Sequence, residues 1–178
     1  MTASVSLREI PIEGLSPAKL WPLLDPAVRS LAAHALYAHE WDEAPTRREA
    51  DAAVAAAIRA REVSVRKMPV EKRAEYLARA VRPSESLASS LLLALHLEHR
   101  RPMLAAFLDA VGIPHEDGLI TGDGEIGAIE GPAVARAAHG LFERFPADEV
   151  AVYLATLLAM DPDLWAALGP ALRERIAP

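Results

Sequence analysis

The sequence predicts an all-α fold. Apolar residues recur at helical spacing along most of the 178 residues, and no segment shows the sustained alternation that is typical of a strand. Prolines stand at or just before the start of successive helical runs, where the missing N–H costs nothing. Hydrophobic residues make up 52% and charged residues 25% of the chain, which excludes disorder as its dominant state. The length fits one domain, residues 1–178.

Residues 17–68 are expected to form a helical pair, because they hold two apolar stripes with spacings of three and four residues. The members of the two stripes are Val28, Leu31, Ala32, Ala35 and Leu36, and then Ala50, Val54, Ala57 and Ile58.

Residues 69–131 and 132–178 are interpreted as two copies of a three-helix unit. Each copy has the order proline–helix, proline–helix, proline–short helix, with Pro83 in the first matching Pro146 in the second. Duplicated helical units of this kind stack side by side, so we expect a helical bundle or a short α-α superhelix.

Two segments, 87–97 and 150–160, are apolar on nearly every side, as in helices enclosed by the rest of a fold. We therefore expect four leucines in them to be buried: Leu91, Leu95, Leu154 and Leu158. Both segments are shorter than the roughly 20 residues that span a bilayer, so no membrane association is expected.

The segment 112–131 interrupts the helical pattern and holds six of the nine glycines. Gly112 is placed to end a helix in the left-handed conformation. Apolar residues flank Asp123 and Gly124, which predicts at most a minute β-hairpin near 119–126 with a tight turn at that pair. We expect this loop to be ordered and packed against the helices. Loops held by rigid helices often carry binding residues.

Four residues form a candidate site for a divalent metal. His96 and His99 stand three apart on one predicted helix, and His115 and Asp117 follow in the glycine-rich loop. Imidazole and carboxylate groups are ligands for zinc or a similar ion. The alternative is that the two helical histidines only complete a helix C-terminus. Without cysteine the chain has no thiolate ligand, disulfide or cysteine nucleophile, and no other cofactor is predicted.

The net charge of −6 hides an uneven distribution of charge. Residues 47–82 carry ten basic and five acidic side chains, whereas residues 83–131 carry two basic and eight acidic ones. The basic block has three alternative roles: pairing with the acidic region 109–130, binding an acidic protein, or binding phosphate or nucleic acid. Net negative charge and a single aromatic residue in the block argue against nucleic acid. The candidate partner-binding residues are Arg66, Lys67 and Arg73.

The function predicted from these features is a non-catalytic helical scaffold or protein-interaction module, with a protein partner or self-association. The N-terminus shows no secretory signal, so we expect a cytoplasmic protein. The alternative is a small metal- or ligand-binding enzyme whose site lies between the His96/His99 helix and the 112–131 loop.

Overall fold

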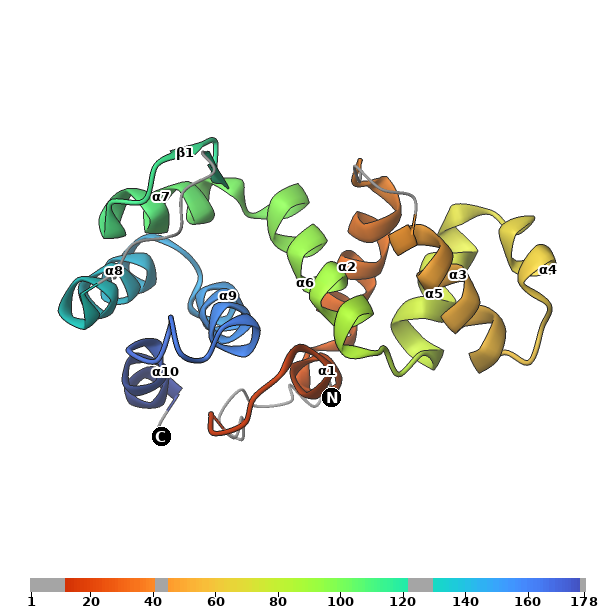
Figure 1. The fold of residues 1–178 in the computed structure, drawn as a ribbon, viewed down its shortest axis with the longest axis horizontal. Coiled ribbons are helices and arrows are strands. Elements are labelled where there is room, and N and C mark those ends of the chain that lie inside the picture. The colour runs from red at the N-terminus through yellow and green to blue at the C-terminus, as the bar shows by residue number, and fades with distance from the viewer. Residues whose placement is uncertain (1–11, 41–44, 122–129, 177–178) are drawn as a thin grey trace. The chain divides into compact units, whose positions relative to one another are not determined.

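The computed structural model of the protein describes residues 12–40, 45–121 and 130–176, and over these ranges the chain is predominantly helical (Figure 1). They contain ten α-helices, one short 3-10 helix and one two-stranded antiparallel sheet, which confirms the all-α prediction. None of the helices in these ranges is both long and apolar enough to span a membrane. The chain divides into two compact units. In the described ranges, unit 1 comprises residues 17–99, and unit 2 comprises residues 12–16 and 100–176.

In the described ranges, unit 1 consists of six α-helices and one 3-10 helix. Its elements are α1 (Pro17–Leu20), η2 (Trp21–Leu23), α2 (Pro26–Ala38), α3 (Pro45–Ala57), α4 (Glu62–Arg66), α5 (Val70–Ala80) and α6 (Glu85–His99). Helix α2 packs against α5 and α6, and α3 packs against α4, α5 and α6. Proline opens α1 and α2, as the sequence predicts, and it also opens α3. The Asp25 side chain caps α2 by accepting the Ala27 N–H at 2.8 Å.

The helices of unit 2 pack around α8. Its elements are α7 (Arg101–Val111), β1 (His115–Glu116), β2 (Leu119–Ile120), α8 (Gly131–Arg144), α9 (Ala147–Met160) and α10 (Leu168–Ile176). Helix α8 packs against α7, α9 and α10. An aromatic cluster fills part of this core, with the ring of Phe107 at 5.7 Å from Tyr153 and 5.5 Å from Trp165. The N-terminal segment 12–16 belongs to this unit, and its Leu15 is buried.

The four leucines predicted to be buried lie in the core. Leu91 and Leu95 on α6 and Leu154 on α9 are fully buried, and Leu158 on α9 is 4% exposed. Nearly all of α9 between residues 150 and 159 is buried, which explains why its sequence shows no polar face.

The described residues contain a small hairpin, and it closes at an Asp-Gly pair that precedes the predicted one. Strand β2 pairs with β1, which precedes it, through a two-residue turn at Asp117–Gly118. Both turn residues have positive φ, 49° and 80°, as a type I′ turn requires. The predicted turn at 123–124 lies outside the described residues. The sequence contains two Asp-Gly pairs, and the first of them closes this hairpin.

The predicted duplication stays a prediction. The helices of the proposed first copy belong to different units, since α5 and α6 lie in unit 1 and α7 lies in unit 2. The proposed second copy, α8 to α10, lies wholly in unit 2.

Truncation of a core leucine should destabilise the unit that contains it. We expect Leu91→Ala and Leu154→Ala each to lower the free energy of unfolding by about 2–5 kcal/mol, because each leaves a cavity. Leu93→Ala is the matched control, since Leu93 lies on the same helix as Leu91 and is 40% exposed. Urea unfolding measures all three, and losses below about 1 kcal/mol for both core variants would contradict the assignment of the core.

The hairpin offers a second test through two glycines with similar backbone. Gly112 and Gly118 have φ of 75° and 80°, but an added Cβ meets nothing within 4 Å at Gly112. At Gly118 it would lie 3.0 Å from the Arg101 carbonyl oxygen and 3.0 Å from the Leu104 Cβ. We expect Gly112→Ala to cost about 1–2 kcal/mol for the left-handed conformation alone. Gly118→Ala should cost about 1–3 kcal/mol more, because the hairpin must move off α7. Equal melting temperatures for the two variants would contradict this packing.

Candidate functional site

The four residues of the predicted metal site lie in different surroundings. His96 is 2% exposed within α6, and His99 is exposed at the end of that helix. His115 lies in the hairpin, where its Nδ1 accepts the Gly118 N–H at 3.2 Å and its Nε2 lies 3.1 Å from the Asp109 carboxylate. Asp117 lies 3.4 Å from the Arg101 guanidinium. His115 and Asp117 therefore connect the hairpin to α7.

In the part of the chain that the structure describes, no three His, Asp or Glu side chains form a group that could hold a metal ion. The metal site stays a prediction, which the metal content of the purified protein would test. Two acidic side chains of this region pair inside unit 2, where Asp109 lies beside His115 and Asp117 beside Arg101.

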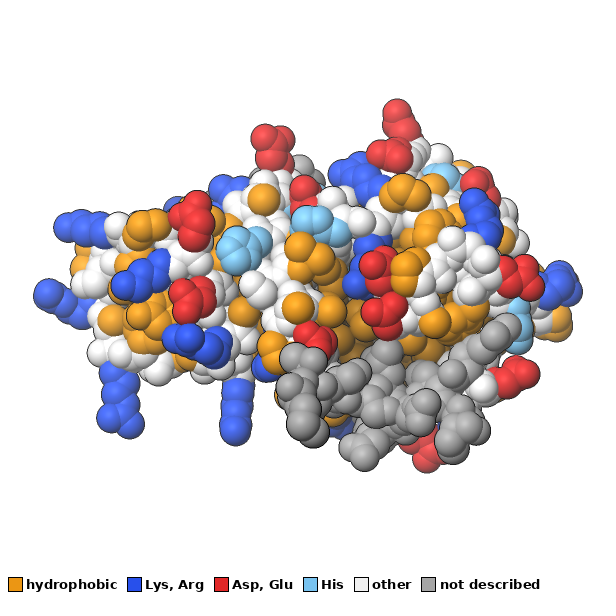
Figure 2. All heavy atoms as spheres, turned by 180° about the vertical axis from the view of Figure 1, so that it is seen from behind, with side chains coloured by type: hydrophobic (Ala, Val, Ile, Leu, Met, Phe, Trp, Pro, Cys, Tyr) orange, Lys and Arg blue, Asp and Glu red, His pale blue; other side chains and the backbone are white. Residues whose placement is uncertain are grey.

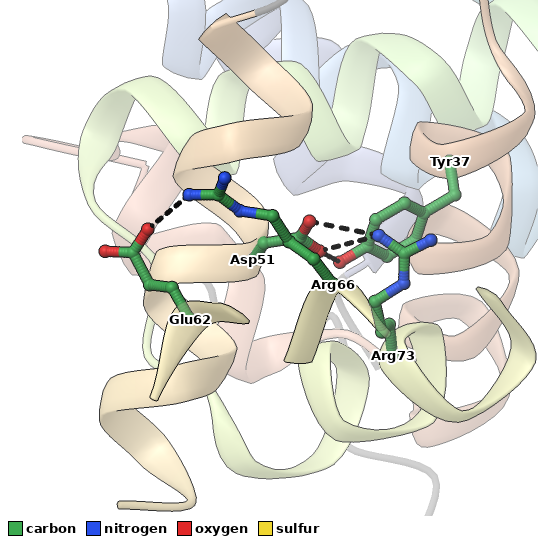
Figure 3. Close-up of polar contacts among 5 residues, drawn as sticks. All are labelled: Tyr37, Asp51, Glu62, Arg66 and Arg73. Atoms are coloured by element: carbon green, nitrogen blue, oxygen red, sulfur yellow. Dashed lines mark hydrogen bonds and ion pairs between the residues drawn. The ribbon is translucent and has the colours of Figure 1, made fainter. Parts of the chain in front are cut away.

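The three predicted partner-binding residues differ in their contacts, and Figure 3 shows two of them, Arg66 and Arg73. Arg66 makes an ion pair with Glu62 at 2.8 Å, and both side chains are about half exposed, at 54% and 51%. Lys67 is exposed. Arg73 instead points into unit 1, where its guanidinium donates to both carboxylate oxygens of Asp51 at 3.0 Å. Arg73 is thus engaged with Asp51, and its assignment to a partner surface stays a prediction.

The contacts of Arg73 belong to a buried polar network that joins three helices. Asp51 on α3 is 5% exposed and also accepts the Tyr37 hydroxyl of α2 at 2.9 Å. The Arg73 guanidinium, from α5, lies 4.8 Å from the centre of the Tyr37 ring. Burial and the hydrogen bond to Asp51 raise the pKa of the Tyr37 hydroxyl above its ordinary value, so this group stays a donor.

A pocket of about 630 Å³ lies at the other end of α5. Three arginines line it: Arg29 from α2, Arg79 from α5 and Arg82 from the segment that follows α5. Trp21 of η2 and Val81 contribute apolar wall. No aspartate or glutamate is among the residues that line this pocket.

Hydrogen bonds from α6 and α3 position the walls of the pocket. The Glu85 carboxylate accepts the Ala18 N–H at 3.0 Å, which ties α1, and the adjoining η2 with Trp21, to the start of α6. The Ser84 hydroxyl donates to the Glu49 carboxylate at 2.6 Å and accepts the Leu87 N–H at 3.1 Å. Ser84 therefore anchors the segment that carries Arg82 to both α3 and α6.

Two donors in the wall of the pocket have no acceptor. The Nε1 atom of Trp21 and the Nε atom of Arg29 are buried, and neither has a hydrogen-bond partner in the described structure. Buried N–H groups without an acceptor are rare, since each costs about 1–3 kcal/mol. Arg79 makes an exposed ion pair with Glu75 at 3.1 Å. The pocket thus combines several positive charges with unused donor capacity, which suits an anion.

Sequence reasoning missed this pocket. Arg79 and Arg82 belong to the predicted basic block, but Trp21 and Arg29 come from a segment about fifty residues earlier. Their meeting depends on the packing of α2 against α5. No local motif in the sequence marks that contact.

Exposed basic side chains follow α5 from one end to the other. We name them the α5 basic surface, and its members are Arg66, Lys67, Lys72, Arg79 and Arg82. Figure 2 shows Lys and Arg side chains gathered over the part of unit 1 built from α3 to α5. The ion pairs of Arg66 and Arg79 are exposed i,i+4 pairs, worth only about 0.3–0.5 kcal/mol each. A partner can therefore displace them at little cost.

Comparison with known proteins adds no relative: the chain matches no protein-family model, no curated protein and no solved structure.

The buried and exposed ion pairs of unit 1 should differ sharply in their effect on stability. We expect Asp51→Ala to lower the free energy of unfolding by about 3–5 kcal/mol, because it leaves the largely buried Arg73 charge, which is 16% exposed, without its partner. Glu62→Ala removes the exposed pair with Arg66 and should cost less than about 1 kcal/mol. Chemical denaturation of the two variants beside the wild type compares them. Similar small losses in both would show that the Asp51 network does not hold the helices together.

Proposed function

We propose that the protein is a non-catalytic helical interaction module, whose unit 1 binds an acidic protein partner through the α5 basic surface and the adjoining pocket. The observation that carries this proposal is the lining of the pocket, which presents three arginines and no acidic side chain. Guanidinium groups bind carboxylates and phosphates through paired hydrogen bonds. They stay protonated, so they are poor general acids, bases and nucleophiles.

The charge distribution of the chain supports an acidic partner. The protein as a whole is acidic, with a net charge of −6, so basic residues gathered along one helix are distinct from the average surface. Complementary charge raises the rate of association and selects against partners of the same sign. Within this proposal the partner is another protein or a second copy of the chain, and the complex forms in the cytoplasm.

The α5 basic surface should decide which proteins the chain captures. Lys67→Glu with Arg82→Glu reverses two exposed charges on this surface, and we expect the double variant to lose the partners that wild type retains from extracts of its own cells. The matched control is Arg136→Glu with Arg144→Glu, which reverses two exposed charges in unit 2. Mass spectrometry identifies the captured proteins, and light scattering reports self-association.

Three outcomes are informative. Partners that are retained by the control variant, lost by the α5 variant and weakened by salt agree with the proposal, because screened charges bind less. Self-association that only the α5 variant loses identifies a second copy of the chain as the partner. Capture of the same proteins by wild type and the α5 variant would refute the proposal.

A further inference from the structure

We infer that the pocket bounded by η2, α2 and the end of α5 is an oxyanion site, which takes one carboxylate or phosphate group carried on an apolar body. This inference deepens the proposed function and rests on it for the origin of the anion. It concerns the pocket alone, so the inference and the proposed function can fail separately.

The positive charges around the pocket favour an anion over water as its occupant. Three arginine residues line one cavity, and no aspartate or glutamate is among its lining residues. In the described structure neither Arg29 nor Arg82 has an ion-pair partner, and the pair of Arg79 with Glu75 is exposed. Like charges held close together repel, and an anion between them converts the repulsion into attraction.

The unpartnered donors indicate where the oxygens of the anion would bind. Trp21 is 2% exposed, and its Nε1 atom and the Nε atom of Arg29 both lack an acceptor. An oxyanion has several acceptor lone pairs and can serve more than one such donor. Both atoms are covered by protein, so pairing requires the side chains around them to move. Trp21 lines the pocket, so its indole N–H signal reports that change.

The size and the remaining wall of the pocket indicate the rest of the ligand. A volume of about 630 Å³ falls within the roughly 300–1,000 Å³ that is usual for small-molecule sites. Trp21, Pro22, Val81 and Pro83 supply apolar surface beside the arginines. A bare ion would leave that surface uncovered, whereas an anionic group attached to a hydrocarbon or a peptide side chain would cover it.

The test follows the indole N–H signals of ¹⁵N-labelled protein by nuclear magnetic resonance. The chain has three tryptophans, and Trp21→Phe assigns the signal of Trp21. Phosphate, acetate, benzoate and a glutamate-rich peptide are titrated separately against chloride, at a constant ionic strength of about 0.1 M. We expect a saturable shift of the Trp21 signal with the oxyanions, none with chloride, and no shift of the Trp165 signal in unit 2. Benzoate should bind more tightly than acetate, because its ring contacts the apolar wall.

Variants of the arginines locate the binding. Arg29→Gln and Arg82→Gln should each weaken the interaction at least about tenfold, since each removes charge-assisted hydrogen bonds. Arg136→Gln, an exposed position in unit 2, should leave the affinity unchanged. Arg82 is exposed, so its variant keeps the test decisive if Arg29→Gln does not fold.

The outcomes distinguish phosphate from carboxylate as the source of the anion, and they distinguish failure of the inference from failure of the proposed function. Binding of phosphate without acetate or peptide assigns a phosphate group, and binding of acetate and peptide assigns carboxylates of a partner. A Trp21 signal that no oxyanion moves, or that moves equally in the arginine variants, overturns the inference. Partner capture without a Trp21 response refutes the pocket and leaves the proposed function standing. A Trp21 signal that responds to oxyanions in a chain that captures no partner supports the pocket and refutes the proposed function.

Discussion

The buried carboxylate of Asp51 organises unit 1. A negative charge that is 5% exposed must be matched inside the protein, and it is matched by a guanidinium from α5 and a hydroxyl from α2. Each partner comes from a different helix, so the charge requires α2, α3 and α5 to meet at one point. The same requirement separates Arg73 from the other basic residues on and around α5. Arg73 contacts Asp51, whereas the others are exposed to solvent.

The outward arginines have a structural role that accounts for only part of their arrangement. The C-terminal end of a helix carries partial negative charge, and Arg79 and Arg82 lie where that charge is felt at the end of α5. Arg29 has no such reason to be there, since it belongs to α2 and its buried Nε has no acceptor. A site that binds anions explains all three arginines together, whereas stabilisation of the helix end explains two of them.

The helices and the core were predictable because their signals are local. Leu91 and Leu154 are buried in helices whose sequences are apolar on nearly every side, and proline opens several helices. The hairpin of the described residues was predictable in kind, because an Asp-Gly pair signals a tight turn, whereas the packing of Gly118 on α7 has no local signal. The inward turn of Arg73 and the meeting of Trp21 with Arg82 could not be predicted. Both depend on contacts between segments that are far apart in the chain, for which charge and spacing along the sequence contain no signal.

The assignment of residues 12–16 to unit 2 has a consequence for biosynthesis. These residues leave the ribosome before the rest of unit 2, and one of their neighbours is Gly169, where an added Cβ would lie 3.3 Å from the Ile12 Cγ2 atom. Unit 1 is continuous from residue 17 to residue 99 and can fold while translation proceeds. The early segment must wait until α10 has been synthesised, roughly 10–30 s at usual rates of translation. During that interval the Ile12 side chain lacks its neighbour Gly169.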